Sequence, residues 1–120
     1  LMLNDANCLH KVYLACGYTD LRLGIDGLAG IVKEHFKLNP FQPGVLFLFC
    51  GRKSDRIKGL LWEEDGFLLL YKRLESGRFQ WPRTESEALS ITPEQYAWLM
   101  QGFSIYQKKP IQKVTPSSPL

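Results

Sequence analysis

The chain has 120 residues, of which 45% are hydrophobic and 22% are charged, and its formal net charge is +3. This composition predicts one globular domain, and the longest apolar runs, Val45–Cys50 and Phe67–Tyr71, fall far short of the ~20 residues that a membrane helix needs. Three widely spaced cysteines without a CxxC pair, and an N-terminus without a secretory signal, predict a cytoplasmic protein with reduced thiols and no membrane partner.

The N-terminal part predicts one strand and one helix. Lys11–Ala15 is rich in β-formers and is expected to form a strand that ends at Cys16 and Gly17. Between Ile25 and Phe36, apolar residues recur at spacings of three and four, which predicts a helix with one apolar face. The segment Asn39–Gly44 contains two prolines and a glycine, so it is expected to be the loop that leads into a sheet.

The segment from Val45 to Pro82 contains four β-prone stretches separated by short polar turns. Such a pattern predicts consecutive antiparallel strands over Val45–Cys50, Arg56–Trp62, Phe67–Arg73 and Arg78–Trp81. The first turn is basic and the second is acidic, so the sheet is expected to carry opposite charges at its two ends. This polarity favours a binding surface over an active site.

A second helix is expected to begin at Thr92. Thr92 suits the N-cap, Pro93 suits the first helical position, and Gln95 completes a capping box, while Gly102 is expected to end the helix. Trp98 is placed on the face opposite the apolar one, which makes it a candidate protein-interface residue. Partial burial against the sheet or the tail is the alternative.

Residues 104–120 contain three prolines and no acidic residue, which predicts a flexible basic tail. Its lysines, Lys108, Lys109 and Lys113, are candidate DNA contacts, because cations bind phosphates without sequence preference. A solubilising tail or a simple linker is the alternative. The expected fold is therefore α+β: residues 1–103 form an antiparallel β-meander of four to five strands with two packed helices, and residues 104–120 form the tail.

The basic turn is the best candidate binding site. It carries four cations within seven residues, and a hairpin could place them across a phosphate backbone: Arg52, Lys53, Arg56 and Lys58. A solvated basic loop is the alternative, and Arg22 and Arg83 could extend the patch. The aromatic residues of the strands, Tyr71 among them, are expected to fill the core, so base stacking on single strands is not favoured.

The sequence does not favour catalysis. His10 and His35 stand in no nucleophile or metal-ligand motif, and the glycines at 24, 27 and 30 lack the spacing of a nucleotide-binding loop. Asp20 and Asp26 suit the start of the first helix, and Glu63–Asp65 suits a solvated turn. We therefore predict no catalytic residues, no metal and no cofactor.

Three ordered blocks of the chain resemble one family: GYTDLRLGIDGLAGIV (Gly17–Val32), LFLFCGRKSDRIKGLLWEEDGFLLLYKRLESGRFQWP (Leu46–Pro82) and ITPEQYAWLMQG (Ile91–Gly102). They are similar to the accessory protein of IS-66-type bacterial insertion sequences, often called TnpB, which is encoded beside the transposase. The resemblance implies a role in DNA transposition through DNA or transposase binding. It implies no catalytic residues, because DNA cutting belongs to the separate transposase.

The sequence thus predicts a non-catalytic accessory protein for DNA transposition that binds DNA through the basic turn. Its expected partners are DNA, contacted mainly at phosphates, and the transposase of the same element. The alternative is a protein-interaction subunit that positions the transposase without contacting DNA.

Overall fold

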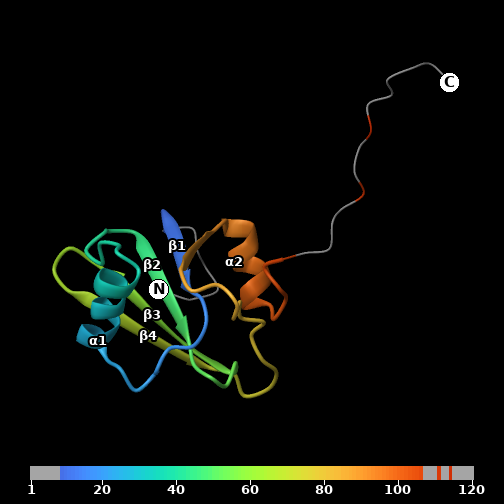
Figure 1. Ribbon diagram of the computed structural model, residues 1–120, viewed down its shortest axis with the longest axis horizontal. Coiled ribbons are helices and arrows are strands. Elements are labelled where there is room, and N and C mark those ends of the chain that lie inside the picture. Colours follow the sequence, from blue (N-terminus) through green and yellow to red (C-terminus); the bar gives the residue numbers. More distant parts are fainter. Residues whose placement is uncertain (1–8, 107–110, 112–113, 115–120) are drawn as a thin grey trace.

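The computed structural model describes residues 9–106 together with 111 and 114. Within this part of the chain, five strands form one sheet in the order β4-β3-β2-β1-β5 (Figure 1). The strands are β1 (Lys11–Ala15), β2 (Val45–Cys50), β3 (Arg56–Trp62), β4 (Phe67–Arg73) and β5 (Ala88–Ile91). The helical segments are α1 (Ile25–Gly30), η1 (Ile31–His35) and α2 (Pro93–Met100). The predicted α+β class is confirmed.

The strands β2, β3 and β4 form two successive antiparallel hairpins, as predicted. In the turn between β3 and β4, the backbone N–H of Glu63 donates to the carbonyl oxygen of Gly66 at 2.9 Å. The register pairs Lys58 with Phe49 on one side and with Tyr71 on the other. Directly paired residues share a face of the sheet, so Lys58 and Tyr71 project from the same face.

The strand β1 pairs parallel with β2 and antiparallel with β5, so the sheet is mixed and extends beyond a simple meander. A parallel pair needs a crossover connection, and α1 with η1 supplies it between β1 and β2. The helix predicted over residues 25–36 is α-helical as far as Gly30. It then widens into a π-helical turn, in which the N–H of Phe36 donates to the carbonyl of Ile31 at 3.1 Å.

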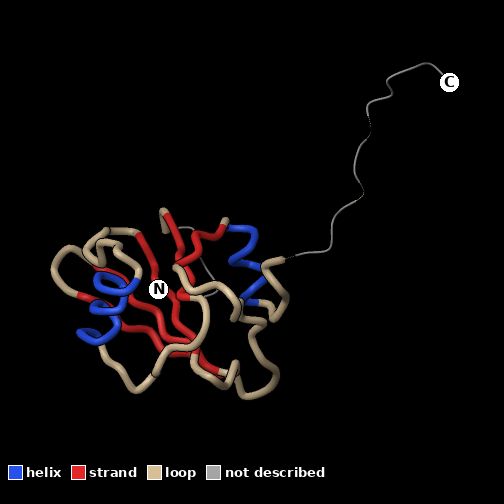
Figure 2. The backbone as a smooth tube through the Cα atoms, in the orientation of Figure 1, coloured by secondary structure: helices blue, strands red, loops and turns tan. Residues whose placement is uncertain are grey.

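The strand predicted at Arg78–Trp81 is wrong. Phe79 and Trp81 are buried in alternation as the pattern required, but they belong to the long loop between β4 and β5 (Figure 2). This loop is held by single hydrogen bonds in place of a strand ladder. The N–H of Phe79 donates to Ser54 O at 2.7 Å, and Trp81 Nε1 donates to Ala15 O at 2.9 Å. The fifth strand is β5, which pairs with β1 instead.

The central strand β2 is buried on both faces, and its alternate residues belong to two different cores. Val45, Phe47 and Phe49 pack with residues of α1, η1 and β3 on one face. The other three residues of β2 pack with residues of α2 and with the loop after β4 on the opposite face. Figure 1 accordingly shows α1 across the β2–β4 part of the sheet and α2 beside β1.

The predicted start of α2 is confirmed, because Thr92 and Gln95 form a reciprocal capping box. After α2, Gly102 adopts a φ of 89°, and the N–H of Phe103 donates back to Trp98 O at 2.9 Å, which is a Schellman ending. Ile105 is only 2% exposed, so the packed region continues past the predicted domain boundary at 103. No helix within the described residues is long and apolar enough to cross a membrane.

Candidate nucleic-acid interface

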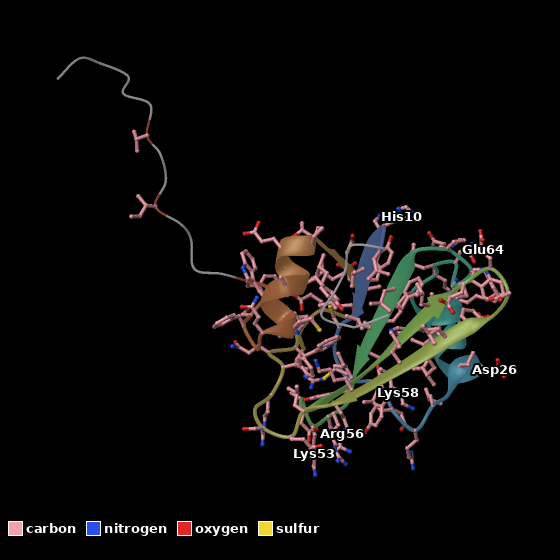
Figure 3. All side chains as sticks on the ribbon, turned by 180° about the vertical axis from the view of Figure 1, so that it is seen from behind. His10, Asp26, Lys53, Arg56, Lys58 and Glu64 are labelled. Atoms are coloured by element: carbon pink, nitrogen blue, oxygen red, sulfur yellow. The ribbon has the colours of Figure 1, made fainter. Side chains whose placement is uncertain are left out.

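The basic turn joins β2 to β3 and lies at the end of the sheet opposite the acidic turn. Figure 3 shows Lys53, Arg56 and Lys58 gathered at this end, with Glu64 at the other. Arg52 and Lys53 are exposed in the turn itself, while Arg56 and Lys58 are half-buried at the start of β3. The structure thus brings the four cations predicted from the sequence to one place.

These cations line an open groove with a volume of about 940 Å³. The groove runs between the loop that precedes α1, the basic turn, and the adjoining ends of β3 and β4. Five cations, one carboxylate, two tyrosines and two leucines are among its lining residues: Arg22, Arg52, Lys53, Arg56, Lys58, Asp20, Tyr18, Tyr71, Leu21 and Leu69. The groove is therefore strongly basic, and its surface is partly apolar.

Two of the four predicted cations already have partners within the chain. Arg56 Nε lies 3.0 Å from Asp55 Oδ1, and this hydrogen bond holds the pKa of the Asp55 carboxyl below its usual value. Lys58 Nζ donates to the carbonyl oxygen of Leu23 at 3.0 Å, which ties the loop before α1 to the sheet. These contacts fix the positions of both side chains.

Within the part of the chain that the structure describes, Arg52 and Lys53 form no ion pair. The guanidinium of Arg52 lies 5.0 Å from the ring centroid of Tyr18, a cation–π contact. Because these two side chains are exposed and form no ion pair with a carboxylate, they can neutralise an incoming anion without first breaking an existing contact to a carboxylate. They are the pair whose removal should matter most.

The groove contains an internal ion pair between Arg22 and Asp20. The guanidinium of Arg22 donates to both carboxylate oxygens of Asp20 at 2.9–3.3 Å, and the backbone N–H of Arg22 donates to Oδ1 at 3.0 Å. The side-chain bond from Arg22 lowers the pKa of Asp20 to about 2. Asp20 is thus a permanent negative charge that partly offsets the basic groove.

Arg83 lies behind the basic turn and supports it. Its guanidinium donates to the carbonyl oxygens of Gly17 and Gly51, each at 2.7 Å, and to Ser54 Oγ at 2.9 Å. Its guanidinium also lies 4.5 Å from the ring centroid of Tyr18, a cation–π contact. Because one side chain bonds to both walls of the groove, Arg83 fixes the turn against the loop before α1. Its role here is to position the groove.

Two groove residues were missed or misplaced from the sequence. Tyr18 was not singled out, and Tyr71 was assigned to the core, yet their exposed fractions are 61% and 56%. Tyr71 stands near the end of the outer strand β4, where the polar sequence Tyr71-Lys-Arg73 follows four apolar residues. That switch to polar residues is the signal that this end of the strand faces solvent. Lys58 Nζ lies 5.9 Å from the Tyr71 ring centroid.

The other candidates from the sequence lie elsewhere. Trp98 is half-buried on α2, away from the groove. The tail lysines, Lys108, Lys109 and Lys113, lie outside the described residues. Asp26 stands in the first turn of α1, as expected of a residue that favours the helix N-terminus.

The acidic turn adjoins an aromatic cluster at the far end of the sheet. Phe41 and Phe67 flank Trp62 with ring-centroid distances of 5.0 and 4.9 Å. Phe41 is 51% exposed, and the neighbouring turn residues Glu63–Asp65 are all exposed. This end of the molecule therefore combines an accessible aromatic surface with negative charge.

A family model described as "IS66 Orf2 like protein" matches residues 10–110 of the chain. "Uncharacterized protein y4hO" of Sinorhizobium fredii (strain NBRC 101917 / NGR234) is 42% identical over 92 residues, which cover 77% of this chain and 79% of that protein. "Uncharacterized protein y4jC" of the same organism is 30% identical over 107 residues, covering 88% of this chain and 91% of that protein. No solved structure gives a significant match.

Proposed function

The chain belongs to the family of IS66 Orf2-like proteins, the accessory proteins of IS66-type insertion sequences, and we propose that it serves transposition by binding DNA in its basic groove. In this proposal the protein is non-catalytic and cytoplasmic, and it contacts DNA mainly at phosphates. Cutting and joining of strands are left to the transposase of the same element.

The observation that carries the proposal is the charge of the groove. Five cations from two separate stretches of the chain, the loop before α1 and the basic turn with the start of β3, converge on it, against the single carboxylate of Asp20. Phosphate contacts supply most of the non-specific affinity of proteins for DNA, and each neutralised phosphate releases condensed counterions. A fixed concave surface with this excess of positive charge suits a polyanion better than it suits a neutral or cationic ligand.

The test is the affinity of the Arg52→Ala/Lys53→Ala variant for a fluorescently labelled DNA duplex, measured by anisotropy. Loss of two phosphate contacts should weaken binding by about 10- to 30-fold near physiological salt. The matched control is Lys33→Ala/Lys37→Ala, which removes the same charge from exposed residues outside the groove. It should change the affinity by less than about twofold. Equal losses in both variants would mean that only net charge matters.

A contact with the transposase is the second candidate function. The observation that favours it is the exposed aromatic Phe41 beside the acidic turn Glu63–Asp65, because aromatic residues are enriched in protein interfaces. Trp98 remains a further candidate for such an interface. Pull-down of the transposase before and after nuclease treatment separates the two functions. Association that survives nuclease and depends little on salt would support a direct contact.

A further inference from the structure

Resting on the proposed function, we propose that the groove takes unpaired DNA nucleotides, whose bases stack on Tyr71 while their phosphates meet the surrounding cations. The ligand class is single-stranded DNA in preference to duplex DNA. This assignment reverses the expectation that the aromatic residues of the strands are all in the core.

The first argument is the exposure of the groove tyrosines. Both Tyr18 and Tyr71 are more than half exposed, although neither lies at a chain end or in a disordered turn. Tyr71 projects from the same face of the sheet as Leu69, which also lines the groove. An exposed ring next to an apolar side chain offers a surface on which a flat apolar ligand gains burial.

The second argument is the placement of cations around each ring. Lys58 Nζ lies 5.9 Å from the Tyr71 centroid, so a base on that ring would have its phosphate within reach of an ammonium. The guanidinium of Arg52 lies 5.0 Å from the ring centroid of Tyr18, so a second aromatic ring of the groove also has a cation beside it. A guanidinium is planar and can itself serve as a stacking surface for bases. The groove therefore alternates aromatic and cationic surfaces, which is the composition of single-strand binding sites.

The third argument compares the base faces that are accessible in duplex DNA and in single-stranded DNA. In a duplex the base faces are covered by neighbouring bases, so an aromatic ring in a protein groove gains nothing from them. In a single strand the faces are free, and stacking on an aromatic side chain strengthens binding for any base. The tyrosines thus contribute to single-strand affinity alone, whereas the cations contribute to both.

The experiment compares three labelled probes of about 12 nucleotides: oligo(dT), an abasic strand with the same phosphates, and a duplex. The variants are Tyr71→Ala, Tyr71→Phe, which keeps the ring, and Phe103→Ala, which removes an exposed aromatic side chain outside the groove. Thermal unfolding confirms that each variant is folded. The full chain is used throughout.

Tyr71→Ala should weaken oligo(dT) binding by about 5- to 150-fold, the range for the loss of one stacked base, and should leave abasic-strand and duplex binding within about twofold. Tyr71→Phe and Phe103→Ala should bind all three probes as the wild type does. In a double-mutant cycle, the binding free energy lost on removing the bases from the strand and the binding free energy lost on removing the Tyr71 ring should not be additive.

Two outcomes would overturn this inference while leaving the proposed function in place. In the first, Tyr71→Ala loses affinity equally for all three probes. In the second, Tyr71→Ala loses no affinity for oligo(dT), while Arg52→Ala/Lys53→Ala still weakens DNA binding. If the wild type binds no probe, or if removal of Arg52 and Lys53 changes nothing, the proposed function falls and the inference falls with it.

Discussion

Replacement of Arg83 by alanine should destabilise the protein and open the groove, although Arg83 touches no ligand. Two hydrogen bonds from its guanidinium to the Gly17 and Gly51 carbonyls are lost. Hydrogen bonds to charged groups contribute about 1.5–3 kcal/mol each. Because Arg83 is only half-buried, we take the low end, which gives a loss of about 3 kcal/mol in the free energy of unfolding.

Urea unfolding followed by tryptophan fluorescence measures this loss. The control is Arg78→Ala, which removes an exposed arginine from the same loop and should change stability by less than about 0.5 kcal/mol. Arg83→Lys should recover little, because one ammonium cannot reproduce a planar donor that spans two carbonyls. An Arg83→Ala protein as stable as Arg78→Ala would refute the assignment of Arg83 as the support of the basic turn.

Three further predictions concern charge, pH and the core. Asp20→Asn should strengthen DNA binding by about 2- to 5-fold, because the Arg22 guanidinium is released from its ion pair while the amide oxygen can still accept from the Arg22 backbone N–H. An unchanged affinity in anisotropy titrations would argue against the groove as the DNA-binding surface. Burial raises the pKa of the Cys16 and Cys50 thiols from 9.0 to about 11, so the folded chain holds these protons more tightly than the unfolded chain. Their contribution to the free energy of unfolding is complete below pH 9 and should be lost as the pH rises to about 11. Urea unfolding at a series of pH values should show this loss in the wild type, and the Cys16→Ala/Cys50→Ala variant should lack it. Trp81→Phe removes the buried bond from Nε1 to Ala15 O and should cost about 1–3 kcal/mol of unfolding free energy; a cost below about 0.5 kcal/mol would mean that the Ala15 carbonyl finds another donor.

Local signals accounted for most of the fold. The hairpins of β2, β3 and β4 and the capping box at Thr92 follow from turn chemistry and short-range patterning, and both were predicted. The pairing of β1 with β2 and β5 joins segments more than 30 residues apart, and no local pattern encodes it. The alternation of Phe79 and Trp81 was misread because a loop lying on a core can bury every second residue without a strand ladder.

The site was only partly predictable for the same reason. Arg52, Lys53, Arg56 and Lys58 are close in sequence, so a hairpin had to bring them together. Tyr18 and Tyr71 face the groove only because the loop before α1 folds against the sheet. That arrangement depends on contacts such as the one from Lys58 to Leu23, which are remote in sequence.

The roles of Arg22 and Arg83, which were candidates to extend the basic patch but could not be placed from the sequence, also depend on this loop. Arg22 lines the groove, whereas Arg83 lies behind the turn and supports it. Charge density along the chain can propose a binding turn, but it cannot tell a ligand-facing cation from a structural one.

The most direct test of the account is the salt dependence of DNA affinity. If four cations each neutralise one phosphate of a duplex, the logarithm of affinity should fall with the logarithm of salt with a slope of about −3.6. Removing Arg52 and Lys53 should make the slope shallower by about 1.8, or by about 1.4 on a single strand, whereas Lys33→Ala/Lys37→Ala should keep the wild-type slope. A folded Arg52→Ala/Lys53→Ala protein with the wild-type affinity and slope would contradict the assignment of the groove as the DNA-binding surface.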